Sequence, residues 1–249
     1  MSDDIKRRML DIARAAQRSG NARCSRFLEP PSLILAKQAA HEAGVSFFAF
    51  GGYLDAERQV AGFASVDDFP DYEWPIACLR IRWQDKYSSV SHRDLLGALM
   101  ALGLDRAMLG DIVMGEGCAY LFALDEVVDY LRANFESAGR ASIKIDQIPI
   151  DKAQIAAPKG REIRVTLASM RLDALVAEGY KLSRADAQLL IKRGLVKLNH
   201  IELDKTDRQV SEGDLVSVRG HGRLKIIEEQ GETKKGRCGV LLFIYENSR

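Results

Sequence analysis

The 249-residue sequence predicts a mixed α+β protein that consists of three parts. Segments with apolar residues at spacings of three and four alternate with short apolar runs bounded by turn residues, which is typical of helices packed on sheets. Positive charge is concentrated toward the C-terminus, and the segment 149–161 has the composition of a linker. The predicted division is a small α/β region at 1–74, a middle domain at 75–148, this linker, and a C-terminal domain at 162–249.

The N-terminal region begins with two amphipathic helices. Ile5, Met9 and Ile12 share one side of the first helix, so we expect that side to face a core. Glycine tolerates the left-handed backbone that ends many helices, so Gly44 is the expected end of the second helix. The expected order is a helix that ends at 19–21, a turn at 27–31, a helix that ends at Gly44, a strand at 45–50 and a strand at 58–65.

Gly51 and Gly52 begin the stretch GGYLDAER. A phosphate-binding loop would need further glycines and a Lys-Ser/Thr pair before a helix, and this stretch has neither. We therefore interpret the glycine pair as a turn that ends a strand.

The middle domain has the order β-α-β-β-α-β, which is ferredoxin-like. Ser91 and Asp94 have the spacing of a capping box at the start of its first helix. The expected elements are a strand at 76–81, this helix, strands at 111–114 and 118–124, a helix that begins at Asp125, and a strand at 142–148.

Tyr120 and Phe122 are two residues apart in the strand 118–124, so they face the same side of the sheet. RNA-recognition modules share this element order and stack bases on strand aromatics, but their aromatic-rich signature is absent from this sequence. We therefore interpret both residues as part of a core.

The C-terminal domain is predicted to contain two short helices followed by small strands. Asp173 opens the first helix, and Ser183 caps the second with its hydroxyl. The inward side of the second helix is expected to consist of Ala187, Leu190 and Ile191. After Gly194 we expect strands at 195–198, 215–218 and 239–245, with a turn at Asn199-His200.

The residues between Arg171 and Arg223 resemble the RNA-binding domain named after ribosomal protein S4. The residues that carry this resemblance are, in chain order, RLD, SR, A, LI, G, V and N, followed by V, GD, V, VRG and GR. Both helices and both turns are in register with that domain. The sequence departs from the family at one turn, where Asn199-His200 replaces the usual Asn-Gly.

Nearly the whole chain resembles the bacterial YlmH-type proteins, which are found in a cell-division gene neighbourhood. The stretches that carry this resemblance are GGYLDAER and SHRDLLGALMALGLDRAMLGDI, followed by the S4-type domain. The resemblance implies a protein that is not an enzyme, needs no cofactor, and binds structured RNA (ribosomal RNA and tRNA). It also implies a role in ribosome-associated quality control, on stalled large ribosomal subunits that still hold peptidyl-tRNA.

The distribution of charge supports RNA binding by the C-terminal domain. Residues 159–225 contain 14 Lys and Arg against 9 Asp and Glu, whereas residues 1–158 contain 18 against 22. Contacts with RNA phosphates need such a local excess. The candidate RNA-contacting residues are Arg171, Arg184, Gln188, Lys192, Arg193, Lys197, Asn199, Arg219 and Arg223.

Arg184 is the strongest candidate, because it lies at a helix start, beside the positive end of the helix dipole. Lys192 follows two turns later, roughly 12 Å along the helix, so both residues are expected to reach phosphates. Replacing both by Ala is expected to weaken RNA binding with almost no change in melting temperature. Two candidates could instead have a purely structural role, which we call the structural alternative. Arg171 would then form a salt bridge to Asp173, and Asn199 would occupy a turn position with left-handed backbone.

No catalytic or metal site is predicted. The four cysteines have no CxxC spacing, and the four histidines never pair at metal-ligand spacing. His92-Arg93-Asp94 resembles the start of a kinase catalytic loop, but Leu99 stands where that loop needs Asn. We interpret the stretch as a helix start.

The expected setting is the cytoplasm, because no apolar run reaches the roughly 18 residues of a membrane helix and the N-terminus lacks the apolar core of a signal peptide. We expect a monomer that binds neither membranes nor DNA.

Two other function classes remain open. Pseudouridine synthases carry the same domain, but before a large catalytic domain with a catalytic Asp. Here the domain comes last, and Lys225 follows Gly222-Arg223-Leu224. The second alternative is an assembly module that binds protein partners.

Overall fold

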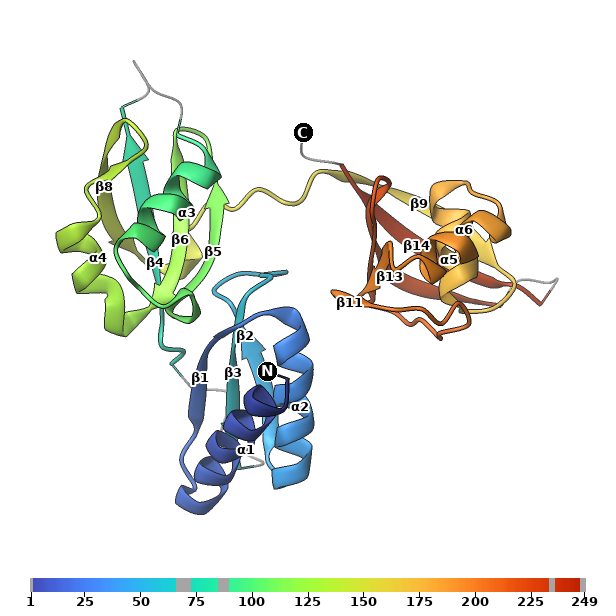
Figure 1. Cartoon of the computed structure of the whole chain (residues 1–249), viewed down its shortest axis with the longest axis horizontal. Coiled ribbons are helices and arrows are strands. Elements are labelled where there is room, and N and C mark those ends of the chain that lie inside the picture. Colours follow the sequence, from blue (N-terminus) through green and yellow to red (C-terminus); the bar gives the residue numbers. More distant parts are fainter. Residues whose placement is uncertain (1, 66–72, 85–89, 233–235, 247–249) are drawn as a thin grey trace. The chain divides into compact units, whose positions relative to one another are not determined.

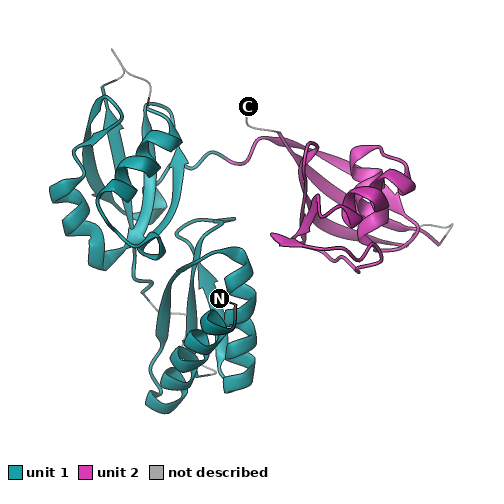
Figure 2. Ribbon diagram, in the orientation of Figure 1, with its two compact units in different colours: residues 1–156 teal, residues 157–249 magenta. Residues whose placement is uncertain are grey.

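The computed structural model describes residues 2–65, 73–84, 90–232 and 236–246. The chain divides into two compact units, residues 1–156 and residues 157–249 (Figure 2). Within the described residues the strands form three antiparallel sheets, two in the first unit and one in the second. The predicted α+β class is confirmed.

Two helices cover one face of the N-terminal sheet, whose strand order is β1-β3-β2 (Figure 1). The second helix buries four alanines, and their small side chains let it lie close to Met9 of the first helix and Phe63 of the sheet. It ends at Gly44, which has φ 67°, as predicted. The elements are α1 (Ser2–Ser19), β1 (Arg23–Leu28), α2 (Pro30–Ala43), β2 (Ser46–Phe50) and β3 (Gln59–Ala64).

The turn predicted at 27–31 is wrong at its start, because Phe27 belongs to strand β1 and lies opposite Val60 of β3. The inward positions of β1 are Ser25 and Phe27, and both are buried. The hydroxyl of Ser25 accepts a hydrogen bond from the N–H of Ala61 at 2.9 Å. A buried serine that is satisfied by backbone interrupts the apolar alternation by which a strand is recognised in a sequence.

The middle part has the predicted order of elements, and its sheet has the strand order β5-β6-β4-β8-β7. Helices α3 and α4 pack on one face of this sheet, where Leu95 and Leu131 are buried against Leu79. The capping box predicted at Ser91 and Asp94 is present. The elements are β4 (Ile76–Trp83), α3 (His92–Ala101), η1 (Arg106–Met108), β5 (Leu109–Met114), β6 (Cys118–Leu124), η2 (Asp125–Val127), α4 (Val128–Asn134), β7 (Ser137–Ala138) and β8 (Ala141–Ile148).

The other face of the middle sheet contacts the N-terminal part. Tyr120 and Phe122 are buried there in one cluster with Phe27, which confirms their prediction as core residues. The ring of Tyr53 stacks on Phe122 with 5.1 Å between the ring centroids. Gly52 has φ 98°, and a side chain at this position would overlap the Phe122 ring.

Asp111 of β5 and the stretch GGYLDAER hold the two parts of the first unit together. The carboxylate of Asp111 accepts hydrogen bonds from the hydroxyl of Tyr53 at 2.9 Å, the N–H of Glu57 at 2.7 Å and the N–H of Arg58 at 3.2 Å. The side chain of Arg58 is buried and donates from Nε to the carbonyl of Leu109 at 3.0 Å. The glycine pair therefore ends a strand, as predicted, and the residues after it bind the middle sheet.

The second unit contains one six-stranded sheet with the order β11-β10-β12-β13-β14-β9. Helices α5 and α6 pack together on one face, where Leu175 and Ile191 are buried against Val216 and Leu224. Ser183 caps α6, as predicted, by accepting from the N–H of Asp186. The elements are β9 (Gly160–Leu167), α5 (Leu172–Tyr180), α6 (Arg184–Lys192), β10 (Val196–Leu198), β11 (Ile201–Glu202), β12 (Leu215–Val218), β13 (Gly222–Glu232) and β14 (Cys238–Tyr245).

Strands β9, β11 and β13 are absent from the sequence-based prediction. Strand β9 begins at Gly160, inside the predicted linker, and pairs along its whole length with β14. The short helix η3 (Ile150–Lys152) lies at the other end of that linker, where Ile155 packs against the core of the first unit. Residues 149–161 therefore contain η3 near one end and the first residues of β9 at the other, and the boundary between the two compact units lies between them. Exposed Arg161, Glu162 and Arg164 interrupt the apolar pattern by which β9 could be recognised in the sequence.

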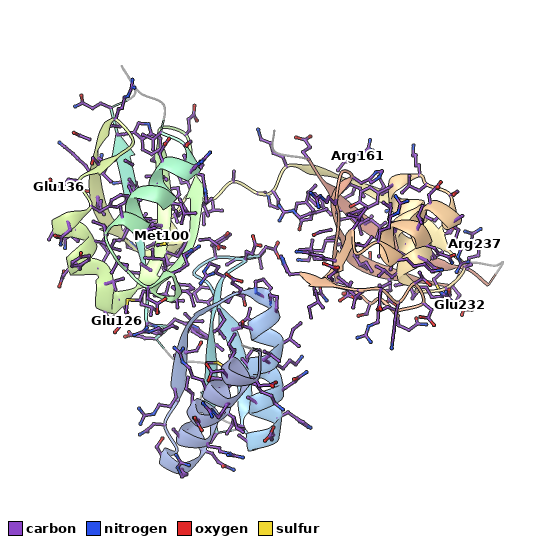
Figure 3. All side chains as sticks on the ribbon, viewed as in Figure 1. Met100, Glu126, Glu136, Arg161, Glu232 and Arg237 are labelled. Atoms are coloured by element: carbon purple, nitrogen blue, oxygen red, sulfur yellow. The ribbon has the colours of Figure 1, made fainter. Side chains whose placement is uncertain are left out.

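The side chain of Arg237, next to the start of β14 (Figure 3), connects strand β9 to helix α5. Its Nη2 donates to the carbonyl of Thr166 in β9 at 2.6 Å and lies 3.4 Å from the carboxylate of Glu178 in α5.

Candidate nucleic-acid interface

A completely buried carboxylate, that of Asp173, organises three of the candidate RNA-contacting residues. Nε and Nη2 of Arg171 each donate to it at 3.1 Å. Arg184 donates through Nη2 to Oδ1 at 3.2 Å and through Nε to Oδ2 at 3.3 Å. The amide of Gln188 donates to Oδ2 at 2.8 Å. The first residues of α5 and the exposed side of α6 are thus bonded into one cluster, which we call the Asp173 cluster.

The chemistry of the Asp173 cluster favours an ionised carboxylate with exposed cations around it. Burial alone would raise the pKa of Asp173, but the hydrogen bonds from Gln188, Arg171 and Arg184 outweigh it and lower the pKa to about 2. The Arg171 and Arg184 side chains remain 31% and 49% exposed, so their outer N–H groups can still reach a ligand. Two cations share one anion, and the cluster keeps a net positive charge beside a helix N-terminus.

The structural alternative foreseen for Arg171, an ion pair with Asp173, is present. Arg184 also forms an ion pair with Asp173, although from the sequence we expected it to be a surface residue equivalent to Lys192. Lys192 lies exposed in the last turn of α6, whereas Arg184 compensates a buried charge. We therefore correct the expectation that replacing both residues leaves the melting temperature unchanged, because loss of Arg184 removes partners from a buried carboxylate.

A second group of candidates lies on the opposite face of the same sheet. Lys197 of β10, Ser217 of β12 and Arg223 of β13 are directly opposite one another in the strand pairing. Directly opposite residues of antiparallel strands point to the same face. The neighbours Val196 and Leu198 face the helices, so this row points away from α5 and α6.

The row lies in a shallow groove of about 770 Å³ that also contains Arg219, Glu202 and Tyr245. The guanidinium of Arg223 lies over the Tyr245 ring, 5.1 Å from its centroid. Glu202 and Tyr245 were not candidates in the sequence. For Tyr245 the sequence did contain a signal: Phe243 and Tyr245 are two residues apart in the predicted closing strand, and residues at this spacing share a face of the sheet.

The remaining candidates lie at the end of α6 and in the turn after β10. Arg193 is the C-cap residue of α6, and Gly194 after it contributes to the groove. Asn199 has φ 48° and His200 has φ 67°, so the turn adopts left-handed backbone at both positions without a glycine. The side-chain amide of Asn199 donates to Asp214 at 2.7 Å and accepts from the N–H of Leu215 at 2.9 Å, which fulfils the structural alternative for this residue.

Among the described residues, no group of three or more His, Cys, Asp or Glu side chains has the geometry to hold a metal ion. None of the helices within the described ranges is both long and apolar enough to cross a membrane.

Three protein-family models match successive parts of the chain. They are described as "YlmH, N-terminal" over residues 2–67, "Putative RNA-binding domain in YlmH" over residues 70–152, and "S4 domain" over residues 170–216. The S4 match contains the whole Asp173 cluster and both residues of the Asn199-His200 turn.

Two known proteins are similar over long stretches. The Bacillus subtilis (strain 168) protein named "Ribosome-associated protein quality control protein P2" is 34% identical over 237 residues, which cover 93% of this chain and 90% of that protein. The solved structure "Cell division protein ylmH from Streptococcus pneumoniae" has a TM-score of 0.52 and 18% identity, with a match that covers 62% of this chain and 94% of that one, so the matched part of this chain shares its fold. The order of the three matched parts and the similarity over nearly the whole length lead to one conclusion: this chain belongs to the YlmH family.

Proposed function

We propose that this protein binds structured RNA on the ribosome, without catalysing a reaction, and acts on stalled large subunits that carry peptidyl-tRNA. The single observation that carries RNA binding is the Asp173 cluster, in which two arginines are held in place by a buried carboxylate at the start of α6. The link to stalled subunits is supported by the similarity to a relative that is named for ribosome-associated quality control.

The geometry of the Asp173 cluster suits recognition of RNA by shape and phosphate contacts. Each arginine uses one side of its guanidinium for Asp173, so its orientation is fixed before RNA arrives and less side-chain entropy is lost on binding. The bases of an RNA duplex are hidden in a deep major groove, which leaves phosphates and 2′-hydroxyls as the accessible groups. Lys192, one turn after Gln188, extends the same positive surface along α6.

We assign the middle domain to the ferredoxin-like class. The element order and the strand order β5-β6-β4-β8 support this assignment. A base-stacking role for its sheet is disfavoured at Tyr120 and Phe122, because both are buried under the N-terminal part. We also propose the division into parts at 1–74, 75–148 and 162–249, with the last part extended to Gly160 so that it contains all of β9. The succession of family matches supports this division.

Absence of catalysis is part of the proposal, and a modification assay tests it. The protein is incubated with ribosomal RNA and with tRNA, and the modified nucleosides are quantified by mass spectrometry. No change is expected. A newly formed pseudouridine would replace the proposal with the pseudouridine synthase alternative.

The binding experiment uses purified large ribosomal subunits with and without peptidyl-tRNA. We expect the full chain to co-sediment with the subunits, more strongly when peptidyl-tRNA is present, and to crosslink to ribosomal RNA and tRNA. The matched variants are Arg184→Ala and Glu228→Ala, the second at an exposed acidic position of β13. Only Arg184→Ala should weaken binding. Crosslinks to messenger RNA alone would overturn the proposed function.

A further inference from the structure

The face of the C-terminal sheet that points away from α5 and α6 combines cations and aromatic rings. Leu224 of β13 pairs with Ile244 of β14 in antiparallel register. The residues next to them, Arg223 and Tyr245, therefore stand opposite each other. On its other side Arg223 lies opposite Ser217 of β12. Two residues further along β13, on the same face, Lys225 lies opposite Phe243 of β14. Two cation–aromatic pairs therefore stand side by side on this face, which we call the open sheet face.

The aromatic rings are held in fixed positions. Phe243 and Tyr245 are in edge contact, with 5.0 Å between ring centroids and 83° between ring planes. The Phe243 ring lies directly over Gly160 of β9, where a side chain would overlap it. Arg223 is exposed and lies over the Tyr245 ring, so its outer surface is a flat, positively charged plane that faces the groove.

The lining of the groove argues against a site for phosphate alone. Glu202 and Glu246 line it together with Lys197, Arg219 and Arg223. Carboxylates repel a phosphate, but they accept hydrogen bonds from the amino and imino groups of nucleobases, while the cations donate to base carbonyls and ring nitrogens. A flat cation beside aromatic rings stacks on bases of any sequence.

We propose that the open sheet face holds unpaired nucleotides of the bound RNA, with one base stacked on the Arg223 guanidinium in the groove. This inference rests on the proposed function and adds a second RNA surface, on the side of the sheet opposite to the Asp173 cluster. The Asp173 cluster contacts the backbone of paired RNA, and the open sheet face contacts a single strand. The stacking residues of the site belong to the longer strands β13 and β14, beyond the span of the S4 match, whereas Gly194, Leu195, Lys197 and Glu202 of the groove lie within that match.

The test compares three RNA probes of equal charge by fluorescence anisotropy at fixed salt: oligouridylate, an abasic oligomer of the same length, and a duplex. Wild type should bind oligouridylate more tightly than the abasic oligomer. Arg223→Lys keeps the charge and loses the flat plane, and Tyr245→Leu removes the ring. Each should weaken oligouridylate binding on the order of tenfold and leave duplex binding unchanged. Tyr245→Phe keeps the ring and should behave as wild type.

Photocrosslinking with an oligomer that contains 4-thiouridine gives a second readout, which does not depend on the stability of any variant. The crosslinked peptide should contain Phe243 or Tyr245. Equal binding of oligouridylate and the abasic oligomer by wild type, or crosslinks confined to α6, would overturn this inference while the proposed function stands. If neither RNA nor ribosomal subunits bind, both are overturned.

Discussion

Arg184 and Asp173 are bonded side chain to side chain at two points, although they begin two different helices. The bond lies between an exposed guanidinium and a carboxylate with no exposed surface. Arg184 thus belongs both to the surface proposed to bind RNA and to the packing of α5 against α6. We therefore expect stability and RNA binding to be coupled at Arg184 and separate at Lys192.

The first prediction concerns this coupling. Arg184→Ala should reduce the free energy of unfolding of the C-terminal unit by roughly 1–3 kcal/mol, because hydrogen bonds to a buried charge are lost. Lys192→Ala should change it by less than about 0.5 kcal/mol, because the residue is an exposed surface position. Both variants should bind duplex RNA more weakly, with a shallower salt dependence. Urea unfolding followed by circular dichroism and binding titrations at several salt concentrations would measure these effects. Equal stability of the two variants would contradict the role given to the Asp173 bond.

The second prediction concerns pH. The folded-state pKa of Asp173 is lowered to about 2, below its ordinary value of 3.8, so its stabilising contribution is complete above about pH 4 and is lost as the pH falls toward 2. Asp173→Asn retains the shape and cannot carry the charge. Wild type should therefore be more stable than Asp173→Asn at pH 6, and the difference should shrink between pH 4 and pH 2. A difference that stays constant down to pH 2 would show that the charge of Asp173 contributes nothing.

The third prediction concerns the independence of the C-terminal unit. A fragment of residues 157–249 contains the complete six-stranded sheet and should unfold cooperatively on heating. A fragment that starts at residue 168 lacks β9, which leaves the eight paired positions of β14 as an open edge. That fragment should be less stable and prone to aggregation. If both fragments melt at the same temperature, β9 is not an integral part of the domain.

The fourth prediction compares two glycines of the first unit. Gly52→Ala places a methyl group into the Phe122 ring at a position with φ 98°, and should cost roughly 2–5 kcal/mol. Gly97→Ala, in the middle of α3, meets no atom within 4 Å and should stabilise the unit by about 0.5–1 kcal/mol. Calorimetric melting temperatures of the two variants should move in opposite directions. A neutral Gly52→Ala would mean that the contact with Phe122 is loose.

The helices could be predicted from the sequence because their signals are local. The Ser183 cap, the Ser91–Asp94 capping box and the Gly44 terminus each depend on residues within one or two turns. Strands β1 and β9 could not be predicted in the same way. Their partners lie far along the chain, and a buried serine in one and exposed charges in the other mask the alternation of apolar residues.

The candidate site was predictable in its residue types but not in its division into two faces. The candidates were chosen as one basic set, and their charges alone do not say that Arg184 lies with the helices and Arg223 on the opposite face of the sheet. The burial of Asp173 was also hidden, because an aspartate at the start of a helix is ordinarily exposed as a partner of the helix dipole. Only the strand register reveals that Arg223 and Tyr245 stand opposite each other.

The stacking of Tyr53 on Phe122 has a consequence for anyone who recombines members of this family. The boundary between the first two family matches falls at residues 67–70, yet the apolar patch on the middle sheet is completed by a tyrosine from before that boundary. In a chimera joined there, Tyr53 and the apolar patch that it covers would come from different parent proteins. A middle domain excised alone would present Tyr120 and Phe122 to water. The first two domains are therefore best exchanged as one piece.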